Sequence, residues 1–296
     1  MASHQVPGNP LRNRYGRRVF GAALLLALTA APLAAQIPDT TKKRPKSDST
    51  KVADSTVTQK AHEIIENAFV VRWYHAAAVA GGTVLVSLLD ESTMRTVQKH
   101  RSNFLNDVST GFRQEGEPWF YIGTSVGVWG AGVIANSHDL RRAGRRLMAA
   151  VAVSGITEQL LKQISGRSRP NEGVGAFKFH PFSSLKDSLG VQTRGSFPSG
   201  HATAAFAVAT SLADDIRNPI ASVLLYTFAA GTMWSRVYDN RHWLSDTVFG
   251  AALGITTAKV VSGRWRIFGW KPPSLLVRPT GEVSAVWTVP LAPLAF

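Results

Sequence analysis

Three short stretches of the sequence combine basic or histidine side chains with turn-forming residues, and each lies at the end of an apolar run. They are "KQISGRSRP" at 162–170, "PSGH" at 198–201 and "SRVYDNRHWLSD" at 235–246. The residues in them that could do chemistry are Lys162, Arg169, Ser199, Gly200, His201, Arg236, His242 and Asp246. If the fold brings these stretches together, cations, imidazoles and a carboxylate surround one position.

The cationic residues of this set are suited to hold an anion. Arg169 and Arg236 carry planar guanidinium groups that match phosphate oxygens, and Lys162 adds a point charge. Ser199 and Gly200 stand at the start of an apolar helical run, where free backbone N–H groups and the helix dipole favour negative charge. These residues predict an oxyanion site at a helix N-terminus.

The histidines and the aspartate add reactive groups to this site. His242 and Asp246 are four residues apart, so on a helix both side chains would share one face. A carboxylate beside an imidazole fixes its tautomer, and an oriented imidazole can attack phosphorus. His201 supplies a second imidazole. Taken singly, each residue has a plain structural explanation, such as a helix cap or a surface ion pair. The whole set favours phosphoryl transfer without a metal ion.

Mostly apolar segments must position these groups. They cover 74–89, 118–137, 147–161, 201–213, 219–234 and about 243–261. Small residues are frequent in them, which lets helices pack closely. We predict an all-α fold, a helical bundle of six or more helices with the active site at helix ends. The stretch 274–289 alternates around Pro279–Gly281, which predicts a small C-terminal β-hairpin.

The two ends of the chain differ from the bundle in composition. Four arginines precede the short apolar run "VFGAALLLALTAAPLAAQ", which is typical of a secretory signal peptide over 1–35; an uncleaved anchor helix is the alternative. Residues 36–60 are rich in Thr, Ser, Lys and Asp, which predicts a disordered tether. The helical bundle is then expected over 61–265, and the tail with its hairpin over 266–296.

The composition indicates which classes of binding partner the chain could have. The 296 residues carry a net charge of +14, half of it within residues 1–61, so the chain could meet anionic lipid or phosphorylated substrates. No nucleic-acid-binding pattern is present, so we expect no nucleic acid partner. The chain contains no cysteine, which excludes disulfides and thiolate metal sites. The sequence leaves the oligomeric state open.

At the three stretches the sequence resembles the superfamily of type 2 phosphatidic acid phosphatases, bacterial acid phosphatases and vanadium haloperoxidases. Its signature is Lys, six residues, Arg-Pro; then Pro-Ser-Gly-His; then Ser-Arg, five residues, His, three residues, Asp. Every signature position matches here, from Lys162 to Asp246. The resemblance covers roughly 70–262, outside the tether and the tail.

The resemblance implies a mechanism and a role for each residue. His242 would be the nucleophile that forms a phosphohistidine, and Asp246 would orient it. His201 would protonate the leaving oxygen and then activate water. The phosphate-binding residues would be Lys162, Arg169, Ser199, Gly200 and Arg236. The implied enzyme is a phosphatase for phosphomonoesters or lipid (di)phosphates, with no metal and no cofactor.

Other functions and substrates stay open at this point. A vanadate-dependent haloperoxidase would use the same anion cage, and a non-catalytic envelope anion-binding protein is the non-enzyme alternative. The segment 171–195 joins the first two stretches and should cover the site. Its Phe177, Phe179, His180 and Phe182 could contact an acyl or isoprenoid chain, but we expect them to pack the loop down. The partner is a phosphorylated small molecule or a lipid phosphate.

Localisation depends on whether the helices cross a membrane. The segments 118–137 and 218–235 are uncharged and long enough to do so. However, if all three stretches share one face, six spans would start on the inner side, whereas a cleaved signal peptide starts the chain outside. We therefore expect an exported, periplasmic bundle, soluble or in contact with a membrane surface, and keep an integral membrane protein as the alternative.

Overall fold

The computed structural model describes residues 68–115, 117–182, 195–268, 274–277 and 283–286. By their contacts the described residues divide into two compact units. Thr83–Ala258 belong to the larger unit, and the residues up to Gly82 and from Lys259 onward belong to the smaller. The predicted signal peptide and tether, 1–60, lie outside the described residues.

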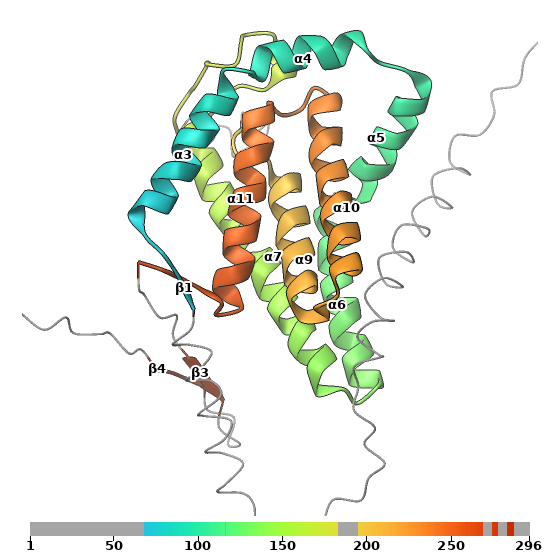
Figure 1. Cartoon of the computed structure of the whole chain (residues 1–296), viewed down its shortest axis with the longest axis vertical. Coiled ribbons are helices and arrows are strands. Elements are labelled where there is room, and N and C mark those ends of the chain that lie inside the picture. Colours follow the sequence, from blue (N-terminus) through green and yellow to red (C-terminus); the bar gives the residue numbers. More distant parts are fainter. Residues whose placement is uncertain (1–67, 116, 183–194, 269–273, 278–282, 287–296) are drawn as a thin grey trace, which may run out of the picture. The chain divides into compact units, whose positions relative to one another are not determined.

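Helices make up most of the described chain (Figure 1). They are α3 (Trp73–Ser87), α4 (Asp90–Lys99), α5 (Asn103–Glu115), α6 (Pro118–Ile134), α7 (His138–Ser165), α9 (Gly200–Ile216), α10 (Pro219–Tyr238) and α11 (Leu244–Val261), with a short 3-10 turn η1 (Pro170–Glu172). The six predicted apolar segments coincide with α3, α6, α7, α9, α10 and α11. The predicted all-α bundle of six or more helices is therefore confirmed.

Two helices and part of a third are absent from the prediction. α4 and α5 are amphipathic and polar, and α4 begins with Asp90 and Glu91 and ends with Lys99, charges that complement the helix dipole. Neither helix contains a long apolar run, so the apolar pattern of the sequence does not reveal them. α7 begins at His138, well before the predicted 147, because "RRAGRR" at 141–146 continues the helix.

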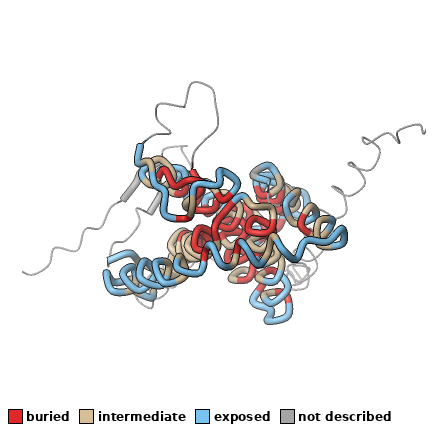
Figure 2. The backbone as a smooth tube through the Cα atoms, turned by 90° about the horizontal axis from the view of Figure 1, so that it is seen from above, coloured by how far each residue is buried: buried red, intermediate tan, exposed pale blue. Residues whose placement is uncertain are grey.

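The centre of the larger unit is α9, which packs against α7, α10 and α6. Its buried face carries Ala205, Val208 and Leu212, and these contact a core to which α6, α7 and α10 also contribute. Tyr121 and Leu147 are among the largest fully buried side chains of that core. Figure 2 shows the buried residues gathered along the middle of the bundle.

Local signals fix where the long helices begin. The side chain of Ser137 accepts a hydrogen bond from the Leu140 amide and caps α7. Asn218 caps α10 in the same way, accepting from the Ala221 amide at 3.0 Å, and Pro219 stands at the first helical position. These caps end the preceding turns and set which residues reach the helix tips.

The smaller unit contains short strands. β1 (Phe69–Val71) pairs in parallel with β2 (Trp265–Ile267), a pairing that the sequence does not reveal because each strand is only three residues long. β3 (Ser274–Val277) pairs antiparallel with β4 (Val283–Val286), which confirms the predicted C-terminal hairpin.

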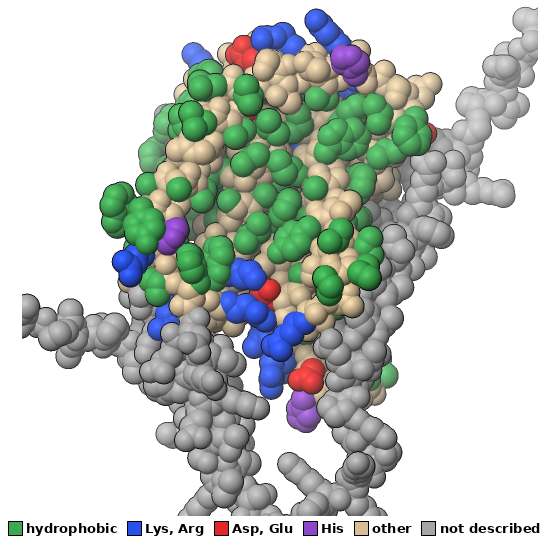
Figure 3. Space-filling model, viewed as in Figure 1, with side chains coloured by type: hydrophobic (Ala, Val, Ile, Leu, Met, Phe, Trp, Pro, Cys, Tyr) green, Lys and Arg blue, Asp and Glu red, His purple; other side chains and the backbone are tan. Residues whose placement is uncertain are grey.

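Large apolar side chains are exposed along the helices of the larger unit (Figure 3). On α6 and α7 they recur every three or four residues, at Trp119, Ile122, Val126, Trp129 and Val133, and at Val153, Ile156, Leu160 and Ile164. We call these rows the α6 stripe and the α7 stripe. Of the described residues, the helix Leu244–Val261 alone meets the length and hydropathy of a membrane span, with a mean hydropathy of 1.2, and Trp119–Ile134 is a shorter apolar helix.

Candidate active site

The candidate site lies where the C-terminal end of α7, the start of α9 and the turn from α10 to α11 meet. α7 ends at Gly166, whose φ of 53° lies in the left-handed region. A Cβ at this position would also collide with the carbonyl oxygen of His180, so only glycine fits. The chain then runs back along 178–180, where the Ser168 amide donates to the Lys178 carbonyl at 2.9 Å. This turn aims Arg167 and Arg169 at the site.

The start of α9 forms a second wall. Ser199 is the N-cap and Gly200 the first helical residue, as the sequence predicts. The Ser199 amide donates to the carbonyl oxygen of Asp246 at 3.0 Å, which joins the start of α9 to α11. A Cβ on Gly200 would lie 2.9 Å from Oε1 of Glu158, so the glycine makes room for this carboxylate. Glu158 in turn forms an ion pair with Lys162, one helical turn further along α7.

The predicted anion-binding groups lie close together and are only partly paired. Among the described residues, Nε and Nη1 of Arg236, Nε of Arg169 and Oγ of Ser199 are buried without a hydrogen-bond partner. Arg236 Nη1 makes only a loose ion pair, 4.0 Å from Asp239. Burial, followed by repulsion from Arg241, lowers the pKa of Arg169. Buried donors without partners are costly unless an anion accepts from them, so they fit a phosphate site.

His242 is buried and its orientation is fixed. Its Nδ1 lies 2.7 Å from the carbonyl oxygen of Ser196. A carbonyl can only accept, so Nδ1 carries the proton and the lone pair remains on Nε2. Burial lowers the pKa of His242 to about 4; Asp246 opposes this shift, and the charges of Lys162 and Arg169 add to it. The ring is therefore neutral near pH 7, as a nucleophile must be.

His242 and Asp246 do not share a helix in the structure. His242 lies in the turn before α11, and Asp246 lies in the first turn of that helix. Asp246 Oδ2 is 3.8 Å from His242 Nδ1 and accepts closer hydrogen bonds from the Trp243 amide, at 2.9 Å, and from the Ser196 hydroxyl. The carboxylate thus holds Ser196, and the Ser196 carbonyl holds the ring.

His201 is in the first turn of α9, as predicted. Its Nε2 is buried without a hydrogen-bond partner among the described residues and lies 4.0 Å from Oε1 of Glu117. The nearby Arg236, His242, Lys162 and Arg169 each disfavour a positive charge on its ring. The second imidazole therefore belongs to the same cluster as the first.

Sequence reasoning missed several residues around this cluster. They are Asp90, Glu158, Ser196 and Ser245, all buried. Arg167 stands in the first stretch, "KQISGRSRP", but the sequence assigns it no role, and the structure shows it buried. Asp90 lies far from the three stretches, and nothing local marks it.

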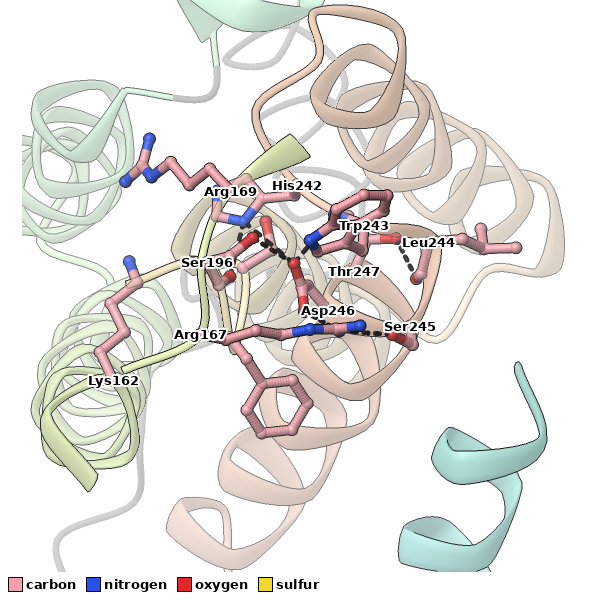
Figure 4. A network of polar contacts seen from close by, with 12 residues as sticks. Lys162, Arg167, Arg169, Ser196, His242, Trp243, Leu244, Ser245, Asp246 and Thr247 are labelled. Atoms are coloured by element: carbon pink, nitrogen blue, oxygen red, sulfur yellow. Dashed lines mark hydrogen bonds and ion pairs between the residues drawn. The ribbon is translucent and has the colours of Figure 1, made fainter. Parts of the chain in front are cut away.

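Figure 4 shows how these groups are arranged. Lys162 and Arg169 extend on one side of the His242 ring, whereas Asp246 and Arg167 lie on the other side. Cations on one side can hold an oxyanion against the ring, and the carboxylate on the other can stabilise positive charge that develops on it. Among the described residues, no group of three or more His, Asp or Glu side chains is placed to hold a metal ion.

Comparisons with known proteins relate the chain to phosphatases. The family model of the PAP2 superfamily matches residues 143–268. A lipid A 1-phosphatase of Porphyromonas gingivalis is 47% identical over 72 residues, which are 24% of this chain and 16% of that protein. Lipid A 1-phosphatases of Rhizobium etli and Rhizobium johnstonii are 34% identical over 113 residues and 29% identical over 199 residues. These matches cover 38% and 62% of this chain, and 45% and 77% of the relatives.

Two solved structures match the chain, and the first of them is similar in fold. A transmembrane PAP2 type phosphatidylglycerolphosphate phosphatase from Bacillus subtilis matches with a TM-score of 0.50 and 20% identity, over 63% of this chain and 94% of that one. LpxE of Aquifex aeolicus matches with a TM-score of 0.46 and 20% identity, over 59% and 94%. The family match confirms the resemblance over residues 143–268, a range that contains every signature residue.

Proposed function

We propose that the chain is a phosphatase that removes phosphate from a lipid phosphate through a phosphohistidine at His242. One observation carries the proposal: a buried, neutral imidazole with its Nδ1 held by the Ser196 carbonyl stands beside buried guanidinium N–H groups without partners. Such an arrangement matches what phosphoryl transfer requires, a fixed nucleophile and fixed positive charge at the phosphate oxygens.

The reaction proceeds in two displacements. Arg169, Arg236 and Lys162, with the Ser199 hydroxyl and the Gly200 amide, bind the phosphate oxygens. The lone pair on Nε2 of His242 attacks phosphorus, a P–N bond forms and the bond to the leaving oxygen breaks. That oxygen takes a proton from the second imidazole, His201, whose protonation the bound phosphate favours.

The second displacement restores the enzyme. Water attacks the phosphohistidine, its proton passes to His201, and the P–N bond breaks to give inorganic phosphate and a neutral His242. Because the phosphorylated ring carries positive charge, Asp246 at 3.8 Å stabilises it in both steps. The cations of the site neutralise the phosphate, so the reaction requires no metal ion.

The surface of the bundle supports a lipid substrate and a membrane location. The α6 stripe and the α7 stripe are exposed apolar rows at helical spacing, with Trp119 80% exposed. A soluble bundle buries such rows, whereas a bilayer covers them. We therefore place these helices in a membrane, in preference to the soluble periplasmic bundle that the sequence favours. Export by the predicted signal peptide stays a prediction.

Phenylalanines beside the site support the same substrate class. The expectation that they pack the loop down is wrong for Phe177 and Phe182, which are 60% and 56% exposed. Phe179 is also exposed, although its ring contacts the Arg167 guanidinium at 5.5 Å. Apolar rings on a loop near the phosphate-binding groups could contact acyl chains. The relatives described as lipid A 1-phosphatases add weight to a lipid phosphate.

The test is phosphate release by the purified full chain in detergent micelles. Phosphatidate, lipid A, a polyprenyl diphosphate and a soluble aryl phosphate should be compared with a chelator present. We expect at least one lipid to give a higher kcat/KM than the aryl phosphate, and acid-labile, base-stable labelling by 32P-substrate that His242→Ala abolishes. Wild-type turnover by His242→Ala would refute the nucleophile, and a preference for the aryl phosphate would refute the lipid substrate.

A further inference from the structure

A buried cation links two buried carboxylates behind the nucleophile. The Arg167 side chain is 3% exposed, and its Nη1 and Nη2 lie 2.6 Å from Oδ1 of Asp246 and 2.8 Å from Oδ2 of Asp90. Both carboxylate side chains are fully buried. Arg167 is therefore shared between α11 and α4.

The remaining polar atoms of this cluster are also satisfied. Arg167 Nε donates to the Ala176 carbonyl at 2.8 Å, and Nη1 also donates to the Ser245 hydroxyl at 2.8 Å. Asp90 accepts from the Ser245 amide at 2.8 Å and from its hydroxyl at 2.6 Å. Buried charges are tolerated only when paired and hydrogen-bonded, so each of these groups constrains the others.

The cluster continues to the reactive ring through the two oxygens of Asp246. Arg167 binds Oδ1, which leaves Oδ2 to accept from Ser196 and from the Trp243 amide. The Ser196 carbonyl then fixes Nδ1 of His242. A chain of contacts thus runs from Asp90 to the nucleophile, and every link is direct.

We propose that Asp90 and Arg167 are positioning residues that aim Asp246 and set the net negative charge behind His242. The inference rests on the proposed function, because the ring of His242 is the group whose orientation it explains. Asp90 also lies outside residues 143–268, which the family model matches. The position adds a member to the site from α4, a helix that carries none of the signature residues.

The charges around His242 predict the direction in which each substitution shifts its pKa. The ring faces Asp246 of α11, Lys162 of α7, Arg169 of the following loop and His201 of α9. Behind Asp246, the Asp90 and Arg167 charges cancel. Removing the carboxylate of Asp90 leaves an extra positive charge that disfavours the imidazolium. Removing the guanidinium of Arg167 leaves an extra negative charge that favours it.

The experiment measures the pKa of His242 directly in the full chain, in detergent, by NMR of 13C-labelled histidine. The His242 signal is assigned by its loss in His242→Asn. Relative to wild type, Asp90→Asn should lower this pKa and Arg167→Gln should raise it, each by about one unit. The double variant restores the net charge and should return the pKa to within about 0.3 of wild type. This readout needs no turnover, so it decides the inference even if the proposed function fails.

Kinetics give a second readout. Asp90→Asn and Arg167→Gln should each lower kcat by about 10–100-fold with KM changed less than about threefold, because the phosphate-binding groups stay in place. Asp139→Asn and Arg95→Gln are matched controls, since Asp139 also lies in the first turn of a helix and Arg95 is exposed. Both controls should behave as wild type.

Several results would overturn the proposal. Shifts of the same sign in the two single variants, or no shift in either, would show that the cluster only supports the fold. A KM effect without a kcat effect would place the cluster in substrate binding instead. If a single charge variant does not fold, the double variant and Ser245→Ala serve as the test. The charge account is refuted if the pKa of His242 in the double variant differs from wild type. It is also refuted if Ser245→Ala shifts this pKa by as much as one unit.

Discussion

Acidification should inactivate His242 only near pH 4. Burial lowers the pKa of His242 to about 4, and protonation removes the lone pair that the proposed attack on phosphorus requires. At pH 5.5 an imidazole with the ordinary value of about 6.5 would be about 9% neutral, whereas one with a pKa of about 4 would be about 97% neutral. The active fraction at this pH should therefore be about tenfold higher than for an ordinary histidine.

The measurement is kcat/KM against pH from 3.5 to 8 with two soluble aryl phosphates that ionise at different pH. The second ionisation of each substrate, near pH 6, also changes kcat/KM, at a pH that differs between the two substrates. Protonation of His242 occurs in the free enzyme, so the fall in kcat/KM that it causes should begin at the same pH with both substrates. It should make the profile steeper below about pH 4. A substrate-independent limb near 6.5 would refute the link between burial and the neutral ring.

Three further predictions concern other parts of the site. His201→Ala should slow alkyl phosphates far more than aryl phosphates, because alkyl leaving groups depend most on protonation; equal losses in kcat would indicate a binding role. EDTA should leave phosphate release intact, and a complete loss reversed by a divalent ion would reveal a metal requirement. Gly200→Ala puts a Cβ 2.9 Å from the Glu158 carboxylate, so KM should rise several-fold through displacement of Lys162. Its control is Gly155→Ala, whose Cβ meets no atom within 4 Å, and an equal rise in KM there would contradict the steric explanation.

The sequence predicts the residues at the helix tips better than the groups that hold them. Apolar runs reveal the long helices, and "PSGH" marks the start of α9 because its turn chemistry is local. The contact from Asp90 to Arg167 joins residues 77 positions apart, so only tertiary packing creates it. The same limit applies to β1 and β2, which are too short to carry a periodic signal.

Spacing alone does not reveal how His242 is held. A separation of four residues fits a helical face. It fits equally well a capping turn in which the Asp246 carboxylate accepts a hydrogen bond from the Trp243 amide. In the turn, the ring of His242 contacts the Ser196 carbonyl, which belongs to another segment and selects the tautomer. Such long-range selection leaves no pattern in the sequence near His242.

The place of Asp90 on α4 limits how small a working enzyme can be made. A fragment trimmed to residues 143–268 would keep every signature residue, yet it would leave Arg167 facing Asp246 without its second carboxylate. Breaking a buried pair by deleting one partner typically costs about 3–5 kcal/mol, a large share of the stability of an ordinary domain. Expression trials and domain transplants should therefore begin upstream of α4.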